Sequence, residues 1–204
     1  MYKALSELLK YRPHEQIIEA IFTERFRKLG DTVDDEFELI KSGHGKICAF
    51  IEEHDSPEEI EDSLRKEHEK ILQGARYALQ RNYEAMGEDE VLNSLSDFYE
   101  KENWLPPEGH PEQLDHISVQ SEFMVYLCAE NRKAIIDRTA DVVHKTLAVQ
   151  RDFLDRHVYN WFPSFADELE KRAISSFYKG LAELIKGFIA TDKEAFTELI
   201  KMVS

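Results

Sequence analysis

This 204-residue sequence contains little glycine, proline or cysteine. The eight glycines and six prolines make up about 7% of the residues, where about 12% is usual. Turns are therefore few, which favours long helices over many short strands. Only two cysteines occur, Cys48 and Cys128, far apart and outside any Cys-x-x-Cys pattern. Neither a disulfide framework nor a structural zinc site is indicated.

Long apolar runs are also missing. The longest, Phe123 to Ala129, has seven residues, whereas a membrane-spanning helix needs about 20. The first ten residues carry Glu7 within their apolar stretch and lack a small-residue cleavage site, unlike a signal peptide. We therefore expect a cytoplasmic protein in a reducing compartment, without stable membrane insertion.

Basic residues are outnumbered, since 26 Lys and Arg face 41 Asp and Glu, and the net charge is −15 at neutral pH. Nucleic-acid binding depends on Lys and Arg at the phosphates, so no nucleic-acid partner is expected. The acidity favours basic partners, or simply keeps the protein in solution. An acidic helical adaptor without specificity for a particular partner is therefore one alternative.

Sequence patterns that hold nucleotide phosphates or a catalytic serine do not occur. None of the eight histidines follows a glutamate by three residues, which disfavours a di-iron carboxylate site in a helical bundle. One His-Asp dipeptide, His54-Asp55, leaves a helical metal-dependent phosphohydrolase as a second alternative. We otherwise expect no cofactor, no metal site and no catalytic residues.

Apolar residues recur with helical spacing almost throughout, and no segment alternates as a strand would. The sequence therefore predicts an all-α multi-helix bundle with no sheet. Ser56-Pro57-Glu58-Glu59 and Thr191-Asp192-Lys193-Glu194 are typical of helix starts with a capping box. The predicted helices span 2–12, 14–28, 34–53, 57–86, 89–102, 112–130, 132–149, 151–161, 164–188 and 192–202.

Three prolines and a glycine interrupt the helical pattern at residues 104–111. This proline-rich hinge loop divides the chain into an N-terminal helical part, 1–103, and a C-terminal helical part, 112–204. The two parts form either two domains or one compact bundle. Because a hinge of this kind permits domain swapping, a monomer and a domain-swapped dimer are both open.

The window from Glu102 to Asn131 carries six carboxylates and no Lys or Arg. In the helix predicted over 112–130, Asp115 and Glu122 are seven residues apart, so their side chains fall on nearly one face. Such a pair suits two neighbouring guanidinium groups. Acidic residues near position 112 also favour a helix N-terminus through the helix dipole. Asp115 and His116, adjacent and therefore poorly placed as a catalytic dyad, suit an anchor that ties the proline loop to a neighbouring element.

Three blocks in this chain resemble the TorD/DmsD family of redox-enzyme maturation chaperones, and they come in that family's order. The blocks are Glu67 to Gly74; Pro111 to Ile117 with Glu122, Phe123, Met124 and Leu127; and Phe153-Leu154, Arg156-His157, Trp161-Phe162-Pro163 and Phe165. Together they cover about residues 67 to 165.

The resemblance implies an all-helical cytoplasmic chaperone, not an enzyme. It implies binding to the twin-arginine leader of a molybdopterin-containing oxidoreductase subunit, whose export is delayed until the cofactor is inserted. The implied partners are that leader and the folded or apo catalytic subunit. Two arginines followed by apolar residues need carboxylates beside an apolar groove. We therefore expect the leader-binding site to be lined by Asp115, His116, Glu122, Tyr99, Trp104 and Met124.

Overall fold

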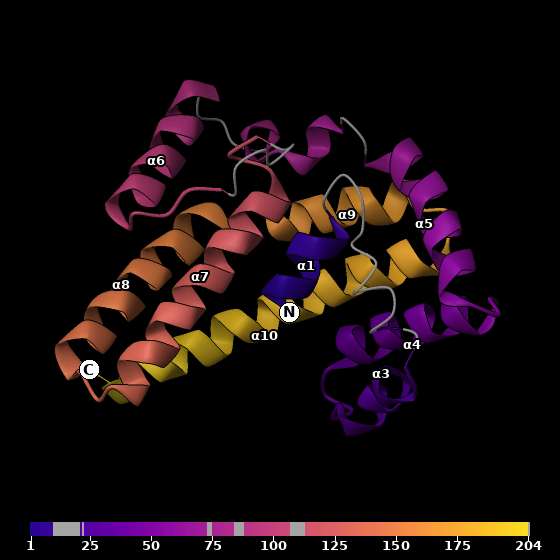
Figure 1. Ribbon diagram of the computed structural model, residues 1–204, viewed down its shortest axis with the longest axis horizontal. Coiled ribbons are helices and arrows are strands. Elements are labelled where there is room, and N and C mark those ends of the chain that lie inside the picture. The colour runs from indigo at the N-terminus through magenta and orange to yellow at the C-terminus, as the bar shows by residue number, and fades with distance from the viewer. Residues whose placement is uncertain (10–20, 22, 73–74, 84–87, 107–112, 204) are drawn as a thin grey trace.

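The computed structural model describes residues 1–9, 21, 23–72, 75–83, 88–106 and 113–203. Within these residues the chain forms nine α-helices and three 3₁₀ turns, and the predicted all-α fold without a sheet is confirmed for this part of the chain (Figure 1). The α-helices are α1 (Tyr2–Leu8), α3 (Glu24–Leu29), α4 (Glu38–Glu52), α5 (Pro57–Ile71), α6 (Glu88–Lys101), α7 (Ile117–Ile136), α8 (Ala140–His157), α9 (Phe162–Arg172) and α10 (Ser176–Val203). The 3₁₀ turns are η1 (Gly30–Thr32), η2 (Arg76–Ala78) and η3 (Gln80–Asn82).

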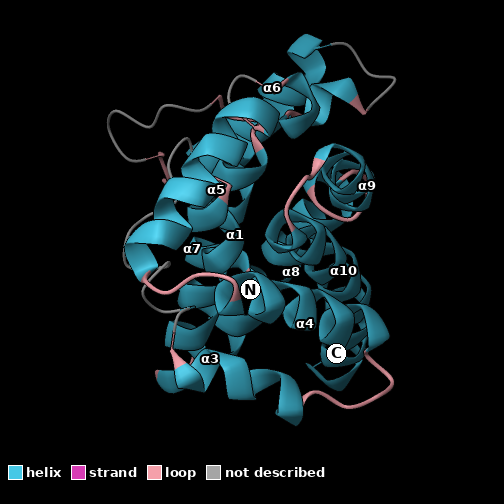
Figure 2. Cartoon of the chain, turned by 90° about the vertical axis from the view of Figure 1, so that its right-hand side faces the viewer, coloured by secondary structure: helices cyan, strands magenta, loops and turns pink. Residues whose placement is uncertain are grey.

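Helix α10 extends along the molecule and organises its core (Figure 1). Helices α4, α8 and α9 all pack against α10, and α1 packs against α7. In the view of Figure 2, α5 and α7 lie to the left of α8, α9 and α10. The largest fully buried side chains are mostly aromatic: Trp161, Tyr99, Tyr178, Phe123, Phe153, Phe162, Phe165 and Phe177. Segments from both predicted halves of the chain therefore share one core.

Two glycines allow α4 and α10 to cross at close range. A Cβ added at Gly43 would lie 2.6 Å from the carbonyl oxygen of Gly180, and one at Gly180 would lie 2.5 Å from the carbonyl oxygen of Gly43. A Cβ at Gly45, two residues along α4, would meet nothing within 4 Å. The crossing therefore depends on glycine at Gly43 and Gly180, but not at Gly45.

The start of α5 is as the sequence predicts. The Ser56 hydroxyl accepts a hydrogen bond from the Glu59 backbone N–H at 3.3 Å, and Pro57 occupies the first turn. The Glu59 carboxylate reaches back to the backbone N–H of Asp55 at 3.0 Å. The Ser56 hydroxyl thus satisfies one of the N–H groups that the helix itself leaves without acceptors.

The predicted helix over 57–86 is wrong in its second half. Helix α5 ends at Ile71, and residues 76–82 form η2 and η3 instead. The backbone N–H of Gln80 donates to the carbonyl oxygen of Asp115 at 3.0 Å, and Leu79 forms an isolated antiparallel bridge with His116. Contacts with the chain before α7 therefore replace the helical hydrogen bonds in this segment.

Three more predicted boundaries, at residues 131, 150 and 191–194, are wrong, because polar residues there make tertiary contacts inside helices. Gln150 lies within α8, which runs without a break from Ala140 to His157. Helix α7 continues through position 131 to Ile136, and the buried Asn131 side chain donates to Gln150 of α8. Helix α10 continues through the predicted cap at 191–194, and its own start, after residues 173–175, was not predicted. Asp192 accepts hydrogen bonds from the hydroxyls of Tyr2 and Tyr159 at 2.8 and 2.9 Å.

Part of the predicted hinge, residues 107–111, lies outside the described residues, as do residues 10–20 of the first two predicted helices. Trp104 follows α6 and is half-buried; its ring centroid is 4.8 Å from that of Tyr99 and 5.1 Å from that of Phe123. No helix in the described part of the chain is at once long enough and apolar enough to cross a bilayer.

Candidate functional site

A buried ion pair lies where the η2–η3 segment meets the start of α7. The Asp115 side chain is fully buried, and Arg81 keeps 10% of its side chain exposed. The Arg81 Nη2 and Nε atoms donate to the two carboxylate oxygens at 2.6 and 2.8 Å, and the Arg81 backbone N–H adds a contact at 3.3 Å. Arg81 also donates to the Gln113 side chain. The hydrogen bonds to Asp115 raise the pKa of Arg81 above its ordinary value.

His116 begins α7. Its Nδ1 atom accepts from the Ser118 backbone N–H at 3.2 Å, which caps the helix, and lies 2.7 Å from the Ser118 hydroxyl. Asp115 and His116 therefore act as the anchor that the sequence indicated, fixing the segment before α7 to residues 79–81. The same geometry corrects one prediction. Asp115 precedes α7 while Glu122 lies on its second turn, so the two carboxylates do not share a helix face.

A buried polar network continues from this ion pair into the core. The Gln80 side-chain oxygen accepts from Gln120 at 2.7 Å and lies 3.1 Å from Nδ1 of His157. Nε2 of His157 lies 3.0 Å from the Ser94 hydroxyl of α6. The indole N–H of Trp161 donates to the Gln120 oxygen at 3.1 Å and to the His157 carbonyl at 2.8 Å. Side chains from η3, α6, α7, α8 and the start of α9 thus meet in one network.

The ring of His157 is neutral in this network. Burial, followed by the nearby charge of Arg156, lowers the pKa of His157 to about 4. A neutral imidazole has one donor and one acceptor nitrogen, which matches donation from Nδ1 to Gln80 and acceptance at Nε2 from Ser94. The network is therefore satisfied without a charge on the ring.

An aromatic wall stands beside the ion pair. The Tyr99 hydroxyl donates to the Leu114 carbonyl at 3.1 Å, and its ring lies 4.8 Å from that of Phe123. Burial, and secondarily the charge of Asp115, raises the pKa of Tyr99 well above its ordinary value. Phe153 completes the wall, with its ring centroid 4.7 Å from that of Phe123. Trp104 covers the outer side, where it remains half-buried.

The six predicted leader-site residues divide by accessibility. Tyr99, Met124, His116 and Asp115 are buried in the core. Trp104 and Glu122 are partly exposed, on the chain after α6 and on α7 respectively. The structure thus brings Asp115, His116, Tyr99 and Trp104 to one junction, where Trp104 is the partly exposed member. Glu122 lies further along, on the second turn of α7.

Sequence reasoning missed three residues of this junction: Gln80, Arg81 and Gln120. Arg81 and Gln80 lay in a segment predicted as helix, where neither has an evident role. A buried carboxylate needs a cationic partner, and that requirement was the one available signal for Arg81. No pattern in the sequence singles out the two glutamines.

Glu67, in the first of the resembling blocks, caps another helix. Its buried carboxylate accepts from the backbone N–H groups of Ile174 and Ser175 at 2.7 and 3.0 Å, directly before α10. The Ser175 hydroxyl accepts in turn from the Tyr178 backbone N–H at 3.3 Å. This block therefore holds α5 against the start of α10.

The His54-Asp55 dipeptide follows α4 and has a local role. Nδ1 of His54 donates to the Phe50 carbonyl at 2.7 Å, and the two rings lie 4.4 Å apart. Over the described residues, no group of three or more His, Cys, Asp and Glu side chains is arranged to hold a metal ion.

Comparisons with known proteins add independent findings. A family described as "Nitrate reductase delta subunit" matches residues 58–167. The selenate reductase assembly chaperone protein of Thauera selenatis is 33% identical over 109 residues, which are 52% of this chain and 55% of that protein. The chlorate reductase assembly chaperone protein of Ideonella dechloratans is 30% identical over 109 residues, with the same shares.

The chaperone protein TorD of Vibrio cholerae is 30% identical over 87 residues, which are 43% of this chain and 38% of TorD. The chain thus spans about half the length, or less, of the curated relatives it matches. No solved structure matches it significantly. The family match includes Arg81, Asp115, Gln120 and His157, and hence the ion pair and most of the network.

Proposed function

This chain belongs to the nitrate reductase delta subunit family, and from that premise we propose that it is an assembly chaperone for the catalytic subunit of a molybdopterin-containing reductase. It acts in the cytoplasm before the reductase is exported, and it binds its client without catalysing a reaction. The observation that carries the proposal is the similarity, over 109 residues, to two proteins named as reductase assembly chaperones.

The chaperone role is tested by the molybdenum content of a client. A catalytic subunit of the selenate or chlorate reductase type would be produced with and without this chain, purified, and analysed for molybdenum. We expect a higher fraction of cofactor-loaded enzyme when the chain is present. Equal molybdenum content under both conditions would contradict an assembly role for that client.

The client segment that we propose is the twin-arginine leader, bound at Asp115, His116, Glu122, Tyr99, Trp104 and Met124. Because Glu122 and Trp104 are partly exposed, they would make the first contacts with an arginine and an apolar side chain. The buried residues would form the wall behind them.

Leader binding at Asp115 requires a rearrangement, because the Asp115 carboxylate is already paired with Arg81. A leader arginine reaches Asp115 only by replacing Arg81, an exchange of one guanidinium for another in the same geometry. The exchange would release the η3 segment, whose Gln80 side chain bonds to Gln120. Leader binding would therefore be coupled to movement of residues 79–82.

Calorimetry with a twin-arginine peptide tests the site. Hydrogen bonds to charged groups contribute ~1.5 to 3 kcal/mol, so Glu122→Gln should weaken binding about tenfold or more. Glu130→Gln is the matched control, since Glu130 is also partly exposed on α7, two turns further along. A peptide with both arginines replaced by lysine should bind weakly, because ammonium lacks the planar fork of guanidinium.

Two results would count against this site. Equal affinity of Glu122→Gln and Glu130→Gln would place the leader elsewhere on the molecule. Equal affinity for the arginine and lysine peptides would favour the acidic adaptor without leader specificity.

A further inference from the structure

The turn between α7 and α8 combines exposed apolar residues with exposed cations. We call residues 132–145 the α7–α8 tip. Ile135 and Ile136, in the last turn of α7, are 60% and 66% exposed, and Val142, near the start of α8, is 46% exposed. Scattered single apolar residues are common on protein surfaces. Large aliphatic side chains that lie close together more often mark an interaction site.

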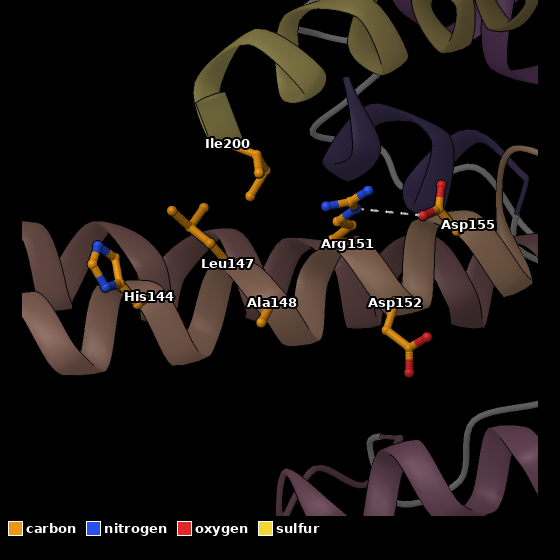
Figure 3. A pocket seen from close by; sticks show the side chains of 7 residues that line it. All are labelled: His144, Leu147, Ala148, Arg151, Asp152, Asp155 and Ile200. Atoms are coloured by element: carbon orange, nitrogen blue, oxygen red, sulfur yellow. Dashed lines mark ion pairs between the residues drawn. The ribbon is translucent and has the colours of Figure 1, made fainter. Parts of the chain in front are cut away.

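The end of α10 extends this apolar surface. The C-terminal end of the chain lies beside the turn from α7 to α8 (Figure 1). Figure 3 shows Ile200 of α10 facing Leu147 of α8, with His144 one turn nearer the tip, and these residues line one shallow cavity. Met202, two residues beyond Ile200, is 83% exposed.

The charge of the tip is opposite to that of the whole chain. Four exposed cations, Arg132, Lys133, Arg138 and Lys145, face two carboxylates, Asp137 and Asp141. In a chain with a net charge of −15 this segment is net positive. None of the four cations forms an ion pair with a carboxylate in the described part of the chain. They are therefore available to an anionic surface.

The backbone of the tip carries a further sign of function. Arg138 has a φ of 54°, in the left-handed region that favours glycine. The Thr139 backbone N–H donates to the Ala134 carbonyl at 3.1 Å, so α7 ends in the tight turn that usually has glycine at this position. An arginine is held here at a conformational cost, which points to a use for its charge.

We propose that the α7–α8 tip docks on an anionic lipid surface. Ile135 and Ile136 are adjacent on a helix and point about 100° apart, so together they present a broad, convex apolar surface. A fluid interface accepts both at once, and the flanking cations then lie at the level of the anionic headgroups. The acidic remainder of the chain is repelled by the same surface, so the molecule is oriented with the tip toward it.

Sedimentation with lipid vesicles tests this docking. We expect the full chain to bind vesicles that contain about one third phosphatidylglycerol, and to bind phosphatidylcholine vesicles far less. Binding should weaken as salt is added, because salt screens the charges. Lys133→Gln with Arg138→Gln should weaken binding about 30-fold. Separately, Ile135→Ser with Ile136→Ser should weaken it at least tenfold, because two apolar side chains are lost from the interface.

A matched control lies at the opposite end of α10. Ile174 is 68% exposed, and together with Lys66 and Lys70 it lines a cavity beside α5. Ile174→Ser removes one exposed isoleucine from that surface, and Lys66→Gln with Lys70→Gln removes two cations. Both changes should leave vesicle binding unchanged.

The glycine variant of the tip separates binding from folding. Arg138→Gly removes a cation and relieves the left-handed backbone, so it should raise the melting temperature while it weakens vesicle binding. The proposal is overturned if the unchanged chain does not bind anionic vesicles at low salt, if both vesicle types bind equally, or if tip and control variants lose affinity alike. Tip-dependent capture by an acidic protein without vesicle binding would also overturn it.

Discussion

Replacing Asp115 with asparagine should destabilise the fold strongly, because it leaves the Arg81 guanidinium largely buried without a counter-charge. Removing one partner of a buried ion pair costs ~3 to 5 kcal/mol. Arg81 keeps 10% of its side chain exposed and retains its contact with Gln113, so we expect the lower end, about 3 kcal/mol. For a chain of this size each kcal/mol lowers the melting temperature by ~2 to 4 °C, which gives a fall of roughly 6 to 12 °C.

A double-mutant cycle in urea, followed by far-ultraviolet circular dichroism, checks this reasoning. Arg81→Met removes the cation and keeps an apolar side chain of similar length. The double variant should therefore be more stable than the sum of the two single losses predicts, by ~2 kcal/mol. The dependence of the free energy of unfolding on urea should stay the same. A loss under about 1 kcal/mol for Asp115→Asn, or single losses that add within about 0.5 kcal/mol, would refute the ion pair as a tie between η3 and α7.

Two further outcomes are expected. Gly43→Ala should destabilise the protein by ~1 to 3 kcal/mol, because the added Cβ would meet the Gly180 carbonyl. Gly45→Ala on the same helix should instead stabilise the protein by ~0.5 to 1 kcal/mol. Thermal melts that rank these two variants equally would contradict the close crossing of α4 and α10. The pKa of His157 is lowered to about 4 from ~6.5 in an unfolded chain, so the unfolded state binds its proton more tightly. The free energy of unfolding should be level above about pH 7 and fall as the pH drops from ~6.5 to ~4, by up to ~3 kcal/mol. In urea melts across this window, His157→Gln should lose less stability, and an unchanged pH profile would contradict a neutral, buried ring.

Much of the helical fold could be predicted, because apolar spacing and local caps are written in short stretches of sequence. The Ser56 cap is one such signal, and it was correct. The predicted cap at 191–194 was wrong, because a side chain that can cap a helix can equally accept a hydrogen bond from a tyrosine far away in the sequence. Asp192 accepts from Tyr2 in this way. The failure at residues 76–82 has the same origin, since that segment is fixed by hydrogen bonds to Asp115, more than 30 residues away.

The family resemblance is confirmed. It could be predicted because its blocks are defined by residue identities, which are read directly from the sequence. The geometry of the candidate site is another matter. The pairing of Asp115 with Glu122 assumed that one helix carries both, but that helix starts at Ile117. Arg81, the partner of Asp115, could not be predicted, because an ion pair between residues far apart in the sequence produces no periodic pattern.

The contact of Tyr2 with Asp192 joins residues 190 positions apart, and it sets an order on assembly. As the polypeptide emerges during synthesis, α1 must wait for α7 before it has a surface to pack on, and its tyrosine must wait for Asp192, in the second half of α10. Until then its apolar face remains uncovered, so α1 is made well before the helices that secure it.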